Sequence, residues 1–368
     1  MLLLTPGPVM TRPEVRAALA QDIAPWDNDF QAVYQRVLRR VLAIAGGVPG
    51  QHEAIPLQGA GHFITEAAIR TFVPPGRKLL IPATGTYADR MVRLTRESGR
   101  VPVLLPIAAD TSTDPAVVEA ALEADPSISH VGMVYSETGS GLIHDAVAIG
   151  AAVRRAGRRM IVDAVSAFGA LPLDISQQPE IDAVVFTANK CIEALPGIAF
   201  AVAPIERLAQ CVGQAGSWSL DLADIPGYQG RPRFTPPAQI VAAFDVALDF
   251  FDAEGGRAPR LARYTANMRT FYDGIVGLGL TPWLSHNRQG PIIVNIRAPD
   301  DPKWDLQRFV DALKTREILI SNFFNTPTPS FRVGCIGAIT PDDMSRAVAA
   351  MDAALTEIGI TRREAACP

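Results

Sequence analysis

Two apolar runs in the middle of the chain decide the fold: "RMIVDAV" at residues 159–165 and "IDAVVFTANK" at residues 181–190. Continuous apolar runs of this length are typical of strands that are buried on both faces of a parallel sheet. Asp163 lies near the end of the first run, and Lys190 closes the second. In such sheets, ligands bind beyond the carboxyl ends of the strands. We therefore expect Asp163 and Lys190 to meet at one edge of the sheet.

Each of these charged residues has a structural and a functional interpretation. A buried carboxylate is costly unless it is paired, so Asp163 could simply cap a helix or accept hydrogen bonds from backbone amides. It could instead hold a buried cation, such as the protonated ring nitrogen of pyridoxal phosphate. Lys190 could be a surface lysine just past a strand, or an amine that forms a Schiff base. Neither structural interpretation predicts that a carboxylate and an amine share a site.

Strand-like and helix-like patterns alternate along most of the chain. We predict strands and helices from apolar runs and helical periodicity, and Asp114 is a candidate N-cap. The predicted strands cover residues 78–83, 101–107, 130–136, 159–165, 181–189 and 197–204, and the predicted helices cover 87–98, 114–124 and 146–157. This alternation predicts an α/β fold whose mostly parallel sheet is covered by helices.

The pattern changes after a long predicted helix over residues 236–256, which glycines close. Beyond it we predict an α+β module with strands over 291–299, 318–323 and 330–337 and helices over 305–316 and 341–355. The predicted domains are therefore an N-terminal segment over 1–15, a large domain over 16–256 and a small C-terminal domain over 257–368.

Composition excludes several classes of function. The chain has 368 residues, a net charge of −4, 48% hydrophobic and 20% charged residues, which is ordinary for a globular protein and argues against nucleic acid or membrane as the main partner. Its four cysteines are scattered and form no C-x-x-C pair, which predicts reduced thiols in a cytoplasmic protein. The N-terminus does not have the pattern of a signal peptide, no apolar segment reaches membrane-spanning length, and the histidines have no metal-binding spacing.

Four further stretches could carry chemistry. The glycine-rich turn "LQGAGHFITEAAIR" (57–70) opens a predicted helix, and free amides at a helix N-terminus bind phosphate. Tyr87 follows a strand and could stack on a flat cofactor, although a core tyrosine is the simpler interpretation. "SETGSG" (136–141) could offer hydroxyls or be a plain turn. Arg332 lies inside an apolar strand, where it would form a buried salt bridge or clamp an acid group.

Taken together, these residues resemble the fold-type I pyridoxal-phosphate enzymes of the class V aminotransferase group. Within that group the chain is most similar to the 2-aminoethylphosphonate–pyruvate transaminase family. Nine blocks follow that family in order and spacing: "TPGPVMTRPEV", "PWDNDF", "LQGAGHF", "SETGSG", "VDAVSAFG", "ANKCIEALPG", "SWSLDL", "RFTPP" and "FRVGCIG". The resemblance covers nearly the whole chain. It implies a large domain with a mostly parallel, seven-stranded sheet that binds the cofactor, a smaller α+β domain, and an N-terminal segment that packs near the active site.

The resemblance also implies an activity and a role for each site residue. The enzyme would move the amino group of 2-aminoethylphosphonate to pyruvate, giving phosphonoacetaldehyde and alanine, in phosphonate catabolism. It would be a cytoplasmic homodimer with shared active sites. The implied roles are Lys190 as covalent anchor and proton shuttle, Asp163 at the ring nitrogen, Val165 and Tyr87 on the two ring faces, Thr138 at the phenolic oxygen, Gly61 and His62 at the phosphate, Thr235 at the neighbouring subunit's phosphate, and Arg332 at the substrate's acid group.

Three departures from that family leave other activities open. His62 replaces a usual threonine and resembles alanine–glyoxylate transaminases, "VYSETGSG" lacks a usual His-Cys pair, and "SNFFNTPTPS" (321–330) replaces a Tyr-Pro-Gly-like segment. The alternatives are an alanine or serine–glyoxylate transaminase, a lyase or desulfurase on the same fold, and a binding protein without activity. Asn189 stands where desulfurases usually have histidine, and a binding protein would have lost Lys190, Asp163 or the phosphate turn. We expect the side chain of Cys191 to point away from the site.

Overall fold

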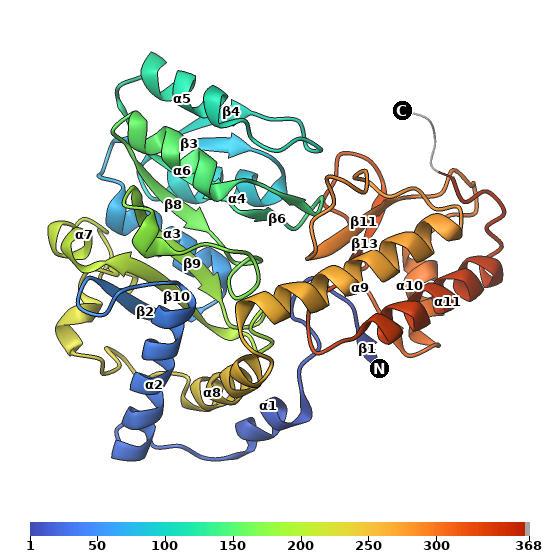
Figure 1. The fold of residues 1–368 in the computed structure, drawn as a ribbon, viewed down its shortest axis with the longest axis horizontal. Coiled ribbons are helices and arrows are strands. Elements are labelled where there is room, and N and C mark those ends of the chain that lie inside the picture. The colour runs from blue at the N-terminus through green and yellow to red at the C-terminus, as the bar shows by residue number, and fades with distance from the viewer. Residues whose placement is uncertain (365–368) are drawn as a thin grey trace.

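The structure is a computed structural model that describes residues 1–364, and a seven-stranded sheet forms the centre of its larger part (Figure 1). In spatial order the strands are β2 (His52–Gly59), β10 (Gly197–Pro204), β9 (Ile181–Thr187), β8 (Arg159–Asp163), β5 (Ile128–Val134), β3 (Lys78–Ala83) and β4 (Val101–Pro106). The strands from β9 to β4 are parallel, whereas β10 is antiparallel to both of its neighbours. The predicted α/β fold with a mostly parallel sheet is confirmed.

Helices cover both faces of this sheet because its strands are apolar on both sides. Side chains alternate along a strand, so Val162 of β8 packs on one face and Ile161 on the other. One face is covered by α2 (Asn28–Ile44), α5 (Pro115–Ala124), α6 (Ala146–Arg155) and α8 (Ala238–Ala253), and the other by α3 (Gly61–Phe72), α4 (Thr86–Glu97) and α7 (Ile205–Gln210). The short helix α1 (Pro13–Ala17) contacts α8.

The smaller part of the molecule begins with the long helix α9, which runs out from the large part (Figure 1). Its other elements are the antiparallel pair β11 and β13, the helices α10 and α11, and a parallel pair formed by β1 and β12. The bounds are α9 (Arg257–Gly277), β11 (Ile293–Arg297), α10 (Leu306–Lys314), β12 (Ile318–Leu319), β13 (Ser330–Gly334), α11 (Pro341–Glu357) and β1 (Leu2–Leu3). These elements share an apolar core that includes Leu2 and Leu4, so the N-terminus packs with the C-terminal third of the chain.

The remaining regular elements are short. A two-residue hairpin is formed by β6 (Ser136–Glu137) and β7 (Leu142–Ile143). Four single-turn 3-10 helices are η1 (Ala18–Ala20), η2 (Ile175–Gln177), η3 (Trp218–Leu220) and η4 (Ile225–Tyr228).

Two details of the sequence predictions can be checked directly. The Asp114 side chain accepts a hydrogen bond from the Ala116 amide at 2.9 Å, which confirms the predicted N-cap of α5. The predicted strand over 318–323 is wrong beyond Leu319. Its partner β1 is itself only two residues long, so the chain after Leu319 has no neighbouring strand to pair with.

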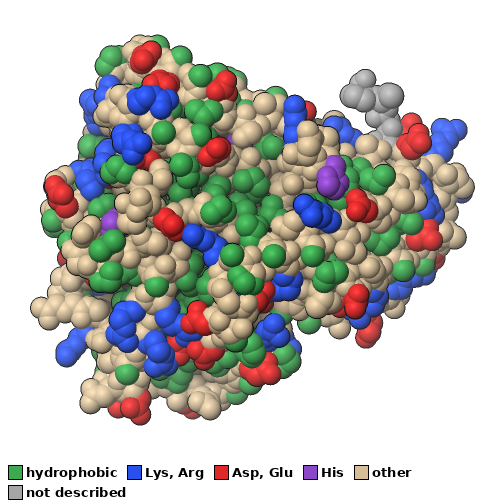
Figure 2. Space-filling view, viewed as in Figure 1, with side chains coloured by type: hydrophobic (Ala, Val, Ile, Leu, Met, Phe, Trp, Pro, Cys, Tyr) green, Lys and Arg blue, Asp and Glu red, His purple; other side chains and the backbone are tan. Residues whose placement is uncertain are grey.

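The surface and the helices are where features of particular partners would appear. On the face drawn in Figure 2, basic and acidic side chains are intermingled and hydrophobic ones gather over the centre. Within residues 1–364, no helix has the length and apolarity to cross a membrane, and no group of His, Cys, Asp and Glu is arranged to hold a metal ion. The described cysteines, Cys191, Cys211 and Cys335, are buried and unpaired, whereas Cys367 lies outside the described residues.

Candidate active site

A cavity of about 220 Å³ opens where β8 and β9 end. The two strands are parallel, so Asp163 at the end of β8 and the turn after β9, which carries Lys190, lie at the same edge of the sheet. Six of the nine predicted site residues line this one cavity: Gly61, His62, Tyr87, Asp163, Val165 and Lys190. The parallel order of two strands thus brings a carboxylate and an amine together.

Lys190 is buried, with 8% of its surface exposed. Its Nζ atom donates a hydrogen bond to the Pro6 carbonyl at 2.9 Å, and a Cβ on Gly7 would collide with the amine. Burial lowers the pKa of Lys190 to about 8, and the positive charge of Arg332 acts in the same direction. A sizeable fraction of this amine is therefore neutral near pH 8 and able to act as a nucleophile or a base.

Asp163 faces the same cavity, and the groups that donate hydrogen bonds to it are neutral. Its Oδ1 atom accepts a hydrogen bond from the Val165 amide at 3.0 Å, and its Oδ2 atom accepts one from the Thr65 hydroxyl at 3.4 Å. No ion pair to Asp163 is present among residues 1–364. Burial raises the pKa of Asp163 to about 6, although these hydrogen bonds act in the opposite direction. At neutral pH it is a carboxylate on which the charges of Lys190 and Arg90 act through space, without an ion pair among the described residues.

The N-terminus of α3 forms another wall of the cavity. Its N-cap residue, Ala60, supplies no side-chain hydrogen bond, so the first amides of the helix, those of Gly61 and His62, remain available. A Cβ on Gly61 would lie 3.0 Å from a methyl of Val165, so glycine permits the close approach of α3 and the turn after β8. Free amides and the helix dipole make this end of α3 suited to a phosphate group.

Tyr87 and Arg90, on the first turns of α4, contribute an aromatic ring and a cation. The guanidinium carbon of Arg90 lies 4.9 Å from the centre of the Tyr87 ring, and both side chains line the cavity. Within the described residues Arg90 forms neither a hydrogen bond nor an ion pair with another side chain. The sequence alone assigned Arg90 no role.

Arg332, on β13 in the smaller part of the molecule, lies in an adjoining cavity of about 460 Å³ that shares Gly7 and Tyr87 with the first. Only 2% of its surface is exposed. Its Nη1 atom donates to the Thr138 carbonyl at 3.2 Å, and its guanidinium lies 4.7 Å from the centre of the Phe323 ring. No carboxylate pairs with it within residues 1–364. A buried arginine that forms no ion pair within the described residues is suited to binding an acid group.

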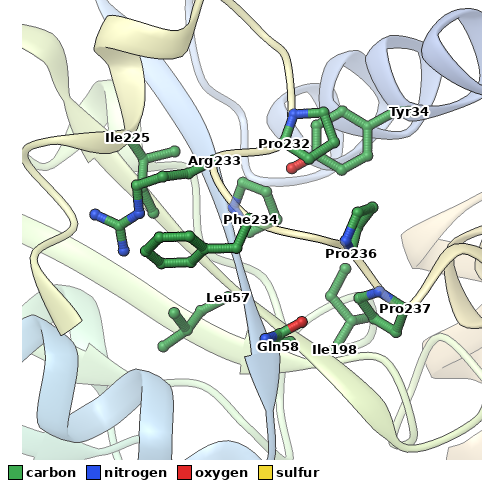
Figure 3. A pocket seen from close by; sticks show the side chains of 11 residues that line it. Tyr34, Leu57, Gln58, Ile198, Ile225, Pro232, Arg233, Phe234, Pro236 and Pro237 are labelled. Atoms are coloured by element: carbon green, nitrogen blue, oxygen red, sulfur yellow. The ribbon is translucent and has the colours of Figure 1, made fainter. Parts of the chain in front are cut away.

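Besides Arg332, two more predicted site residues, Thr138 and Thr235, lie outside the first cavity. The Thr138 hydroxyl is 2.8 Å from the Ser166 hydroxyl, and what Thr138 offers Arg332 is its backbone carbonyl. Thr235 is exposed on the segment 232–237, whose neighbours line a separate small cavity beside Tyr34 and Leu57 (Figure 3). In a single chain, Thr235 does not line the cavity that holds Lys190.

Sequence reasoning missed several residues that the fold brings to the site. The Pro6 carbonyl and Gly7 come from the far N-terminus, and Thr65 comes from the second turn of α3. The Asn325 side chain accepts a hydrogen bond from Arg332 at 3.0 Å once its amide is oriented to satisfy both neighbours. A backbone carbonyl, a glycine and a threonine have no motif of their own, so these contacts required the tertiary structure.

Comparison with known proteins places the chain in a family. The family described as aminotransferase class-V matches residues 28–322. A 2-aminoethylphosphonate–pyruvate transaminase of Burkholderia lata is 42% identical over 98% of this chain and 96% of its own length, and one of Pseudomonas putida is 37% identical over 98% of each.

Among solved structures, a pyridoxamine–pyruvate aminotransferase of Mesorhizobium loti is similar with a TM-score of 0.89 and 26% identity, covering 98% of this chain and 93% of its own. An alanine–glyoxylate aminotransferase of Nostoc sp. shares the fold, with a TM-score of 0.87 and 21% identity over 96% and 95% of the two chains. The chain therefore belongs to the class V aminotransferases, a family of enzymes that depend on pyridoxal phosphate.

Proposed function

We propose that this enzyme moves the amino group of 2-aminoethylphosphonate to pyruvate, giving phosphonoacetaldehyde and alanine. The observation that carries the proposal is a buried arginine, Arg332, that lacks a carboxylate partner within residues 1–364 and borders the cavity of Lys190. Relatives that are about 40% identical over 98% of the chain carry this activity in their names. An anionic amine that enters this site would find a cation for its acid group and a basic amine for its proton.

The first cavity has the groups that pyridoxal phosphate requires. The cofactor, when bound, supplies a carbonyl that condenses with amines and a ring that accepts electrons from the adjacent carbon. Asp163, which forms no ion pair within the described residues, would hold a positive ring nitrogen, and the free amides of Gly61 and His62 would hold the phosphate. Tyr87 and Val165 would contact the two faces of the ring, and Thr138 would approach its phenolic oxygen.

The chain's own residues would carry the proton transfers. Lys190 would anchor the cofactor covalently and, once a substrate amine displaces it, would be free as a buried base. Because burial lowers the pKa of Lys190 to about 8, the free amine can take a proton from the donor carbon and return it to the acceptor. Arg332 would hold the acid group of each substrate in turn, which keeps the reacting carbon near Lys190.

We propose further that the working enzyme is a cytoplasmic homodimer. Trp218 is 63% exposed and packs edge-on against Phe234, next to the exposed Thr235, and Phe63 on α3 is 43% exposed. Exposed aromatic side chains in one neighbourhood are typical of a surface that a partner covers. A second copy covering them would bring Thr235 to the phosphate site of its neighbour. The unpaired, buried cysteines support a reducing compartment.

A second activity, transfer from alanine or serine to glyoxylate, is favoured by His62 at the start of α3. The test is the visible absorbance of the cofactor-loaded enzyme as 2-aminoethylphosphonate is added, with alanine in a parallel cell. We expect the phosphonate to bleach the band at the lower concentration. Bleaching by alanine alone would overturn the phosphonate proposal and leave the fold and the cofactor in place.

A further inference from the structure

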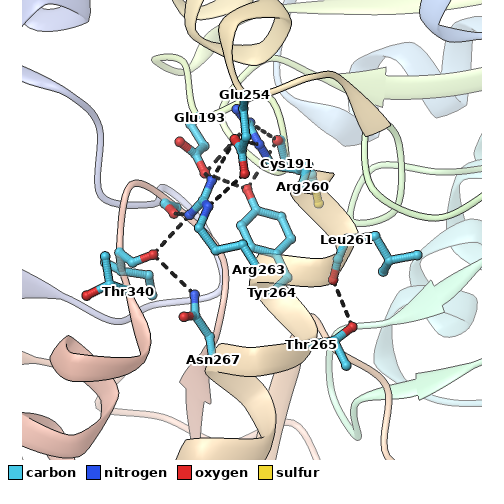
Figure 4. A network of polar contacts seen from close by, with 12 residues as sticks. Cys191, Glu193, Glu254, Arg260, Leu261, Arg263, Tyr264, Thr265, Asn267 and Thr340 are labelled. Carbon is cyan, nitrogen blue, oxygen red and sulfur yellow. Dashed lines mark hydrogen bonds and ion pairs between the residues drawn. The ribbon is translucent and has the colours of Figure 1, made fainter. Parts of the chain in front are cut away.

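A cluster of polar and charged side chains contacts the turn just after Lys190, and none of its members lines the cavity that holds Lys190 (Figure 4). It joins the turn after Lys190 to the first turns of α9 and to the segment that follows β13. We call it the α9 cluster, and its members are Cys191, Glu193, Glu254, Arg260, Arg263 and Tyr264. Both arginines donate to Glu254, from Arg260 Nε at 2.7 Å and from Arg263 Nε at 2.8 Å.

The α9 cluster fixes the backbone next to Lys190. The carbonyl of Cys191 accepts a hydrogen bond from Arg260 Nη1 at 2.7 Å, and the Tyr264 hydroxyl lies 3.2 Å from the same oxygen. Arg260 and Tyr264 are fully buried, so water cannot replace these contacts.

The side chain of Glu193 secures the far end of the same turn. The backbone φ angle of Glu193 is +62°, a left-handed conformation that residues other than glycine rarely adopt. The Glu193 amide donates a hydrogen bond to the Lys190 carbonyl at 2.9 Å. The Glu193 carboxylate accepts hydrogen bonds from Arg263 at 2.6 Å and from the Tyr264 hydroxyl at 2.7 Å. These charged and buried partners hold the turn in a conformation that it would not adopt by itself.

The α9 cluster also reaches the strand that carries Arg332. Arg263 Nη1 donates to the carbonyls of Gly337, at 2.6 Å, and Ile339, at 3.0 Å, just after β13 ends. The Ala338 amide between them donates to the Met10 carbonyl at 2.8 Å, in the N-terminal segment whose Pro6 accepts from Lys190. Contacts therefore run from the backbone of Lys190 through α9 to the small domain, and back to the Lys190 amine.

We propose that Arg260, Arg263 and Tyr264 are positioning residues, which hold the Lys190 turn and set its place relative to Arg332 in the other domain. The inference rests on the proposed role of Lys190 as the cofactor anchor. Burial alone would lower the pKa of Arg263. The hydrogen bond to Glu254 and the charge of Glu193 nevertheless raise this pKa above its usual range. Arg263 therefore stays charged at every pH at which the enzyme folds.

The test compares two hydroxyl deletions on the same helix, Tyr264→Phe and Tyr272→Phe. Both tyrosines are buried and both direct their hydroxyl at a backbone carbonyl, but Tyr272 donates to Leu284, far from the Lys190 turn. In the cofactor-loaded enzyme we expect Tyr264→Phe to lower kcat about three- to tenfold, the size of one lost hydrogen bond, with KM changed less. The midpoint pH at which the visible absorbance of the bound cofactor changes should also shift. Tyr272→Phe should lower Tm by about as much as Tyr264→Phe does. It should leave kcat and the pH of the absorbance change at the parental values.

Parental kcat and absorbance in Tyr264→Phe, or an equal loss of kcat in both variants, would overturn the inference. If Tyr264→Phe does not fold, Glu193→Gln is measured against the same criteria, because it keeps the shape and removes only the charge that faces Arg263. Lys190→Ala distinguishes failure of the proposed function from failure of the positioning role. A visible, covalently bound cofactor in Lys190→Ala would refute the proposed function, whereas a parental Tyr264→Phe would refute only the positioning role.

Discussion

Asp163 and Asp182 lie on neighbouring strands, β8 and β9, yet their surroundings differ in one decisive respect. Asp182 is fully buried and accepts hydrogen bonds from His130 at 3.0 Å and from Arg207 at 2.9 Å, as well as from Arg159. Burial alone would raise the pKa of Asp182, but these hydrogen bonds hold it well below its usual range. Asp163 forms no ion pair within the described residues, and burial raises its pKa to about 6 although the charges of Lys190 and Arg90 act in the opposite direction.

The difference shows how a structural carboxylate can be told from a functional one. Asp182, near the start of β9, completes its ion pairs within the chain, so it needs nothing from outside. Asp163, at the opposite end of β8, accepts hydrogen bonds from an amide and a hydroxyl and forms no ion pair within residues 1–364, so it is free to pair with a positive group of a ligand. Asp163 and Asp182 are both aspartates removed from solvent. They differ in that Asp163 forms no ion pair within the described residues, and this difference marks the candidate site.

The largest expected effect separates the two aspartates by activity. Asp163→Asn removes the charge that would stabilise the cofactor's ring, so turnover should fall about 10²–10³-fold, the size typical of losing one pre-oriented electrostatic partner. Steady-state rates on 2-aminoethylphosphonate and pyruvate measure it. Turnover within threefold of the parent would mean that Asp163 is as structural as Asp182.

Asp182→Asn tests the other half of the comparison. It leaves Arg159 and Arg207 without their buried partner, and the unfolding free energy should fall by about 3 kcal/mol. We expect the low end of the range because 30% and 25% of the two arginine side chains are exposed and can be rehydrated. Urea unfolding measures the change. Turnover of the folded variant should stay parental, and a large loss of turnover at full stability would contradict the assignment.

Arg332→Met extends the comparison to an unpaired cation. The substrate's acid group would lose its charged donor, so KM for both substrates should rise about 10- to 100-fold. Arg297→Met is the matched control, because Arg297 lies on the paired strand β11 but stacks on Trp283, 4.2 Å from the ring centre. Equal KM values in the two variants would exclude Arg332 from substrate binding.

The smallest expected effect is a dependence of stability on pH in the cofactor-free protein. The folded pKa of Asp163 is raised from 3.8 to about 6. Its contribution to stability is therefore fully present below about pH 4 and is lost as the pH rises through about 6. The parent should lose on the order of 1–2 kcal/mol over this interval relative to Asp163→Asn. Parallel curves of unfolding free energy for the two proteins would refute the raised pKa.

Sequence reasoning was sufficient where one strand end determined the geometry, whereas for distant segments it gave at most an expected neighbourhood and no residue contacts. Apolar runs predicted β8 and β9, and their parallel order brought Asp163 and Lys190 to one edge. The carbonyl of Pro6 is 184 positions from Lys190, and no local pattern announces such a contact. The strand predicted over 318–323 failed because its partner, β1, is only two residues long.

The most direct test of the central claim is to reduce the cofactor-loaded enzyme with borohydride, digest it and find the modified peptide by mass spectrometry. The chain has only four lysines, at positions 78, 190, 303 and 314, and Lys190 is the buried one. The account predicts the added mass of the cofactor on the peptide that contains Lys190 and on no other. The mass on Lys78, Lys303 or Lys314, or no added mass in the loaded enzyme, would contradict it.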